Sequence, residues 1–131
     1  MQPKNMHFGE FIRSKRQSDD RELTLKDVAT ALDMSLSMLS DIEQGRRKPF
    51  DSDKIEAFCK FMNLDETERG LMYDLAARET RKIPEDIVDV MMYSESGEKA
   101  RRALRLTRTG IADESDWDRF IKELENKKKG Q

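Results

Sequence analysis

Residues 35–48 combine hydroxyl, carboxylate and cationic side chains at regular spacing. If this segment is helical, Ser37, Ser40 and Asp41 share one face, and three cations, Arg46 to Lys48, follow it directly. Hydroxyl and carboxylate groups hydrogen-bond to the edges of bases, and cations bind phosphates. The pattern also fits the solvated face of an ordinary helical bundle, so both interpretations stay open at this point.

Two residue types that often serve in catalysis or metal binding are isolated in this chain. His7 is the only histidine, and no second histidine or Cys/Asp cluster accompanies it. Cys59 is the only cysteine, so no intramolecular disulfide can form, and its apolar surroundings in "AFCKFM" place it in the core. We therefore expect no enzyme activity, no metal and no cofactor.

Length and composition limit the fold class. The chain has 131 residues, enough for one domain or for one small domain with an appendage. Charged residues make up 40% of it, and the mean hydropathy is −0.88. No stretch approaches the roughly 20 apolar residues that span a bilayer, and no signal-peptide pattern occurs, so a cytoplasmic protein without membrane contact is expected. Sparse glycine and proline and the absence of alternating apolar and polar residues predict an all-α fold.

Capping residues and apolar periodicity place eight helices in this sequence. Thr24 with Asp27 forms a capping box, Ser35 is an N-cap, and Gly45 occupies the position just after a helix end. The helices are expected at about residues 7–17, 24–32, 35–44, 52–62, 65–79, 84–92, 94–109 and 113–125.

Two short apolar faces flank a tight turn in this pattern. They comprise Val28, Ala29 and Leu32 before the turn, and Met34, Leu39 and Ile42 after it. Only Asp33 and Met34 separate the two helices, and Asp33 tolerates the left-handed conformation that such a turn requires. Ala29 is small where the helices approach each other most closely. This spacing predicts a helix-turn-helix, whose second helix enters the major groove.

The chain resembles the Cro/repressor-like (Xre) helix-turn-helix family over about residues 8–75. The resemblance is carried by "FIRSKR", "LTLKDVATAL", "MSLSMLSDIEQGRRKP" and "KIEAFCKFMNL". It implies a five-helix, lambda-repressor-like domain, here placed at residues 1–80. A C-terminal extension of about three helices follows at residues 81–131. It also implies a homodimer that binds double-stranded DNA sequence-specifically and regulates transcription, most often by repression.

The resemblance further assigns roles to individual residues. The base-reading positions fall on Leu36, Ser37 and Asp41. The positions beside the DNA backbone fall on Ser35, Ser40, Arg46, Arg47 and Lys48. Leu36 would pack on a thymine methyl group, Ser37 would bond a base edge, and Asp41 would accept from a cytosine amino group.

The charge balance keeps a second class of function open. Residues 1–79 contain 13 Lys and Arg against 16 Asp and Glu, so DNA affinity would depend on where the charges lie. The alternative is a protein-interaction module on the same fold, such as an antitoxin that binds a partner protein. Leu36 and Met38 would then serve as apolar anchors.

The C-terminal extension carries more apolar side chains than a single neighbouring helix would cover. Ile87, Val88, Val90, Met91 and Met92 surround the helix expected at 84–92, and Trp117, Phe120, Ile121 and Leu124 form a stripe near the chain end. These faces either fold back on the domain or pair across a two-fold axis. Arg101, Arg105 and Arg108 share a face that either contacts nucleic acid or is solvated and paired with nearby carboxylates.

Overall fold

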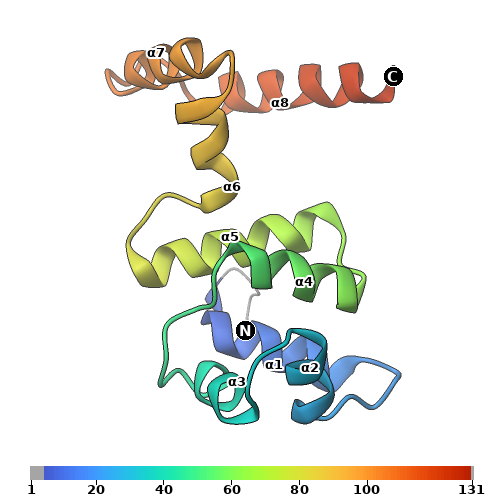
Figure 1. Cartoon of the computed structure of the whole chain (residues 1–131). Helices are drawn as coiled ribbons and strands as arrows, with labels where there is room; N and C mark the ends of the chain where they lie inside the picture. Colours follow the sequence, from blue (N-terminus) through green and yellow to red (C-terminus); the bar gives the residue numbers. More distant parts are fainter. Residues whose placement is uncertain (1–4, 131) are drawn as a thin grey trace. The chain divides into compact units, whose positions relative to one another are not determined.

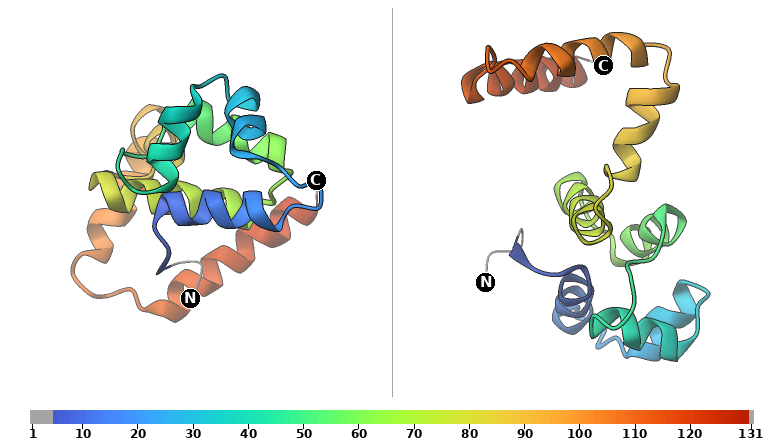
Figure 2. Two further views of the ribbon diagram at one scale, coloured as in Figure 1. Left: turned by 90° about the horizontal axis from the view of Figure 1, so that it is seen from below. Right: turned by 90° about the vertical axis from the view of Figure 1, so that its left-hand side faces the viewer.

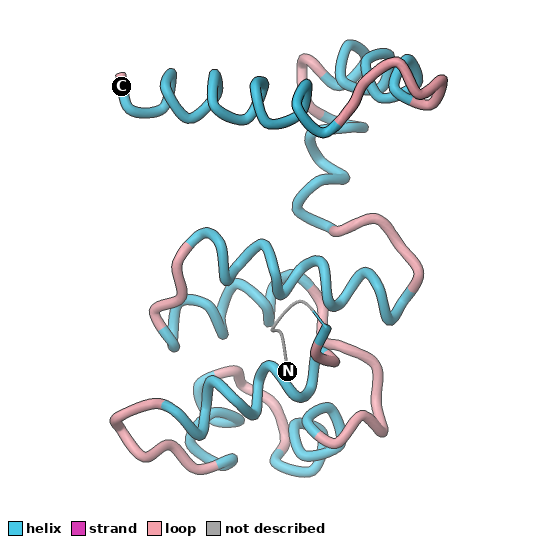
Figure 3. Tube along the Cα trace, turned by 180° about the vertical axis from the view of Figure 1, so that it is seen from behind, coloured by secondary structure: helices cyan, strands magenta, loops and turns pink. Residues whose placement is uncertain are grey.

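The computed structural model describes residues 5–130, and every regular element in that range is a helix (Figure 1, Figure 3). The helices are α1 Phe8–Ser18, α2 Leu25–Ala31, α3 Leu36–Glu43, α4 Ser52–Met62, α5 Glu66–Thr80, α6 Glu85–Val88, the π-helix η2 Asp89–Tyr93, α7 Gly97–Thr107 and α8 Glu114–Lys129. The predicted all-α class is confirmed. None of these helices is both long and apolar enough to cross a membrane.

The chain forms two compact units, one ending at Val88 and the other beginning at Asp89. In the first unit, α4 and α5 lie side by side, α1 packs against α5 and α3, and α2 packs against α3 and α4 (Figure 1, Figure 2). Helices α2 and α3 thus lie together at one end of this unit, and α3 rests on α1.

Local sequence explains where the helices of the first unit begin. Thr24 and Asp65 form capping boxes with Asp27 and Glu68, and the Asp51 carboxylate accepts a hydrogen bond from the backbone N–H of Lys54. Each side chain satisfies a backbone N–H that has no partner inside the helix. The predicted starts of α2, α4 and α5 are confirmed, and a short polar side chain caps each of these three helices.

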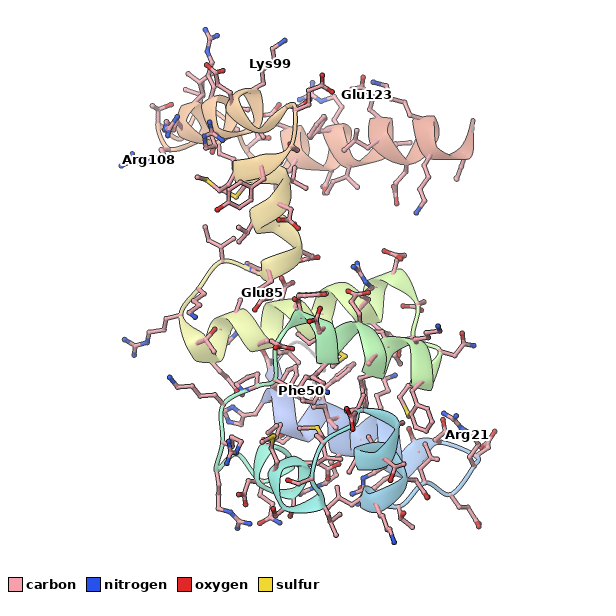
Figure 4. The ribbon with its side chains drawn as sticks, viewed as in Figure 1. Arg21, Phe50, Glu85, Lys99, Arg108 and Glu123 are labelled. Atoms are coloured by element: carbon pink, nitrogen blue, oxygen red, sulfur yellow. The ribbon has the colours of Figure 1, made fainter. Side chains whose placement is uncertain are left out.

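The core of the first unit is built from aromatic and aliphatic side chains of all five of its longer helices. Phe50, labelled in Figure 4, lies in this core. Its ring meets Phe8 edge-on, with ring centroids 5.0 Å apart, and lies 6.4 Å from the Phe58 ring. Cys59 is buried in this core with its Sγ 3.7 Å from the sulfur of Met72, as predicted. Burial raises the pKa of the Cys59 thiol to about 11.

Helix α1 approaches α3 so closely that only glycine fits at position 9. A Cβ atom on Gly9 would lie 2.1 Å from the carbonyl oxygen of Ile42 and 2.7 Å from that of Glu43. The C-terminal turn of α3 therefore rests directly on the α1 backbone.

The second unit differs from the first in having almost no interior. Of residues 89–130, Gly97 alone is buried. The helix expected at 84–92 is α-helical only as far as Val88 and continues as the π-helix η2, which corrects that prediction. The N-terminus of α7 packs on η2, where the Arg101 guanidinium donates to the Met91 carbonyl. Arg101 therefore has a structural partner.

Candidate nucleic-acid interface

The turn between α2 and α3 is fixed by backbone hydrogen bonds. Asp33 adopts the left-handed conformation, with φ of 52°, as predicted. Its N–H donates to the Thr30 carbonyl at 3.1 Å, and the Met34 N–H donates to the Ala29 carbonyl at 3.0 Å. These two bonds make a Schellman motif, which ends α2 and redirects the chain into α3.

Lys54, on α4, holds this turn from outside. Its ammonium group donates to the Leu32 carbonyl at 2.5 Å and to the Asp33 carbonyl at 3.3 Å. Carbonyls at a helix C-terminus carry partial negative charge, so a cation there is favourable. Sequence reasoning missed Lys54, because the contact depends on how α4 packs against α2.

Helix α3 buries one side and presents the other to solvent. Leu39 and Ile42 are buried, whereas Leu36 is 49% exposed and Ser37 is exposed. Ser40 and Asp41 are partly exposed on the same side, and Ser40 Oγ accepts a hydrogen bond from the Gln44 amide at 3.1 Å. The structure thus places all five predicted residues of α3 and its N-cap around one accessible surface.

The Ser35 hydroxyl caps α3 and also contacts the Ser37 hydroxyl. Ser35 Oγ accepts from the backbone N–H of Met38 at 3.1 Å. The cap does not use the Ser35 O–H, and Ser35 Oγ lies 3.5 Å from Ser37 Oγ, where either hydroxyl can donate to the other. The N-terminus of α3 therefore offers a hydroxyl group and the positive end of a helix dipole at one place.

The end of α3 repeats the geometry of the turn that precedes it. Gly45 has φ of 80°, its N–H donates to the Ile42 carbonyl at 3.1 Å, and the Arg46 N–H donates to the Asp41 carbonyl at 2.8 Å. This second Schellman motif confirms the predicted position of Gly45. It also directs the three exposed cations, Arg46, Arg47 and Lys48, away from the helix end.

Two of the predicted DNA-contacting residues contact each other. Arg46 Nη2 lies 3.0 Å from Asp41 Oδ1, and Arg46 Nε donates to the same oxygen at 3.1 Å. Both side chains are substantially exposed, so the pair is worth little to stability. Its effect is to neutralise the one carboxylate on the exposed face of α3.

A buried ion pair fixes α3 against α1. Arg16 Nε and Nη2 each donate to a different carboxylate oxygen of Glu43 at 2.9 Å, and Arg13 Nε lies 3.6 Å from Glu43 Oε1. The Glu43 side chain is only 3% exposed and that of Arg16 is 15% exposed. These hydrogen bonds raise the pKa of Arg16. Sequence reasoning missed this pair, although Glu43 lies four residues after Leu39, on the buried side of α3.

The other side chains considered for chemistry have structural partners. His7 Nδ1 lies 3.4 Å from Glu79 Oε1, which also accepts the backbone N–H of Phe8 at 2.9 Å. Among residues 5–130, no group of three His, Cys, Asp or Glu side chains is placed to hold a metal ion.

Comparison with known families matches residues 7–72, half of the chain, to a model described as a helix-turn-helix domain. Comparison with curated proteins and with solved structures finds no significant match. The matched range begins at the residue before α1 and ends within α5, so it includes the α2–α3 pair and the basic segment after it. The chain belongs to the helix-turn-helix domain family.

Proposed function

We propose that this protein is a sequence-specific DNA-binding transcriptional regulator of the Cro/repressor-like type that inserts α3 into the major groove. The observation that carries the proposal is the exposed surface of α3, which carries hydroxyl side chains and the half-exposed Leu36 and is followed by three exposed cations. Hydroxyl groups hydrogen-bond to base edges, and apolar side chains pack on thymine methyl groups. Cations bind phosphates and so fix the position of the protein on the duplex.

We assign individual roles from the family resemblance, and the contacts around α3 are compatible with them. Ser35 donates its O–H to a phosphate in place of the Ser37 hydroxyl, while Leu36 and Ser37 meet base edges. Arg47 and Lys48 bind phosphates, together with Arg46 once it leaves Asp41. Asp41 accepts from a cytosine amino group through its second oxygen, because a carboxylate accepts at both oxygens.

The protein acts as a homodimer in this proposal and represses transcription. One α3 helix contacts few bases, and joining two of them multiplies both affinity and site length. We expect an inverted repeat whose half-sites lie about one helical turn apart, roughly 34–36 Å. Repression is the simplest outcome of occupying such a site, since it requires no further protein contact.

Salt dependence of DNA binding tests the phosphate contacts. Arg47→Ala and Lys48→Ala should each weaken binding to all duplexes similarly and reduce the log–log salt slope by up to about 0.9. Lys60→Ala is the matched control, because Lys60 is exposed on α4 near its C-terminus. No binding to any duplex at low salt, or equal effects of all three substitutions, would overturn the proposal.

A protein-interaction module such as an antitoxin is the second candidate. The observation that favours it is the half-exposed Leu36 in the first turn of α3. This function predicts that a pool of random duplexes yields no enriched sequence.

A further inference from the structure

Helix α8 carries an apolar stripe that its own unit leaves uncovered. Trp117, Phe120, Ile121 and Leu124 are 39–51% exposed, and α8 makes at most isolated contacts with the other helices of that unit. Spacings of three, four and seven residues from Trp117 put all four side chains on one face. This face is continuous over two helical turns.

The spacing of these four residues is symmetric about the midpoint between Phe120 and Ile121. Trp117 and Phe120 are three residues apart, as are Ile121 and Leu124. Two copies of α8 in antiparallel orientation therefore bring Trp117 against Leu124 of the second copy and Phe120 against Ile121 of the second copy. The stripe is complementary to itself in this orientation, as an interface on a two-fold axis requires.

The charges of α8 favour the same orientation. Asp113, Glu114, Asp116 and Asp118 stand at its N-terminal end, whereas Lys127, Lys128 and Lys129 stand at its C-terminal end. Within the helix, Asp116 pairs with Arg119 and Lys127 lies 3.9 Å from Glu123. In the antiparallel register that the stripe sets, Asp113 and Glu114 lie level with Lys128 and Lys127 of the second copy, whereas Asp116 and Asp118 lie level with Glu125 and Glu123. The favourable charge contacts are therefore at the two ends of the pair, and a parallel pair would place like charges together at both ends.

We propose that α8 pairs antiparallel with α8 of a second copy of this chain, through the stripe Trp117, Phe120, Ile121 and Leu124. This inference rests on the dimer of the proposed function and names its interface. Half-exposed side chains of this size leave on the order of 400 Å² of apolar surface per copy, about half of the ~800 Å² per partner in a standard interface. The dimer is therefore weak alone, and binding of both copies to one DNA site strengthens it.

Sedimentation equilibrium of the full chain without DNA tests the association. The natural chain should dimerise at tens of micromolar, and Phe120→Glu should weaken dimerisation at least tenfold by burying a charge in the stripe. Ile111→Glu is the matched control, since Ile111 is 74% exposed and lies outside the stripe. A monomer at 100 micromolar, or equal dimerisation of Phe120→Glu, would overturn the proposal. Phe120 is half exposed, so its replacement should leave the circular dichroism of the monomer unchanged.

Single cysteines test the orientation in a Cys59→Ala background. Glu114 and Lys128 each lie seven residues from Ile121, on its side of α8 and about 21 Å from each other along the axis. A mixture of Glu114→Cys and Lys128→Cys chains should crosslink with a short bis-maleimide, and neither chain should crosslink by itself. Crosslinking of Glu114→Cys alone would show a parallel pair and overturn the proposal.

Charge reversal provides an independent measurement. Lys128→Glu with Lys129→Glu should weaken dimerisation, and adding Glu114→Lys at the facing end of the second copy should restore part of it. In a parallel pair the first change would have little effect, because it replaces one like-charged pair with another. All of these measurements are made without DNA. A failed α8 interface and a failed DNA-binding function are therefore distinguishable.

Discussion

Removing the carboxylate of Glu43 should strongly destabilise the helix-turn-helix unit. Glu43→Ala leaves the guanidinium groups of Arg16 and Arg13 without the buried anion that both contact. The substitution removes both 2.9 Å hydrogen bonds that Arg16 donates to the Glu43 carboxylate, whose side chain is only 3% exposed. Breaking a buried ion pair from one side typically costs about 3–5 kcal/mol, because the remaining charge stays partly desolvated.

The control for this experiment is the exposed ion pair on the same helix. Asp41→Ala removes the contact with Arg46 and should cost about 0–1 kcal/mol. In urea unfolding followed by circular dichroism, a slope of about 2 kcal/mol/M converts the Glu43→Ala loss to a midpoint shift of about 2 M. The unfolding midpoint of Glu43→Gln should lie between those of Glu43→Ala and Asp41→Ala, since the amide keeps one acceptor oxygen. If Glu43→Ala and Asp41→Ala unfold at the same midpoint, the buried pair does not fix α3 to α1.

Four further predictions concern packing and can be checked on the purified chain. Gly9→Ala should lower the free energy of unfolding by at least about 1–3 kcal/mol, because its Cβ would meet the Ile42 carbonyl. Gly70→Ala, which meets no atom within 4 Å on α5, should instead raise it by up to about 1 kcal/mol. Ala29→Leu should cost about 1–3 kcal/mol in the same assay, and an unchanged midpoint would contradict the close approach of α2 and α3. The Cys59 thiol, buried and with its pKa raised to about 11, should resist alkylation at pH 8 until the chain is unfolded, and rapid labelling of the native protein would refute its burial.

Local signals were sufficient to predict most of the fold. Capping side chains and left-handed turn residues act through their own neighbours, so Thr24, Ser35, Asp33 and Gly45 could be placed without tertiary information. The π-helical continuation after Val88 could not be predicted, because the sequence there contains neither proline nor glycine to mark a change of helix geometry.

The candidate site was predictable in outline but not in its supporting contacts. The exposed side of α3 followed from burying Leu39 and Ile42. Lys54 and the Arg16–Glu43 pair depend on contacts between residues 22 and 27 positions apart, which helix periodicity does not encode. The ion pair between Asp41 and Arg46 also requires the backbone path around Gly45, which brings the two side chains to the same place.

Selection of bound sequences from a random duplex pool, with the natural chain and with Ser37→Ala, tests the central claim most directly. If α3 reads bases, the natural chain should enrich an inverted repeat. Ser37→Ala should then change the preferred base at one position of each half-site and leave the other positions intact. No enriched sequence from the natural chain, or the same base preferences from both proteins, would contradict base reading by the exposed face of α3.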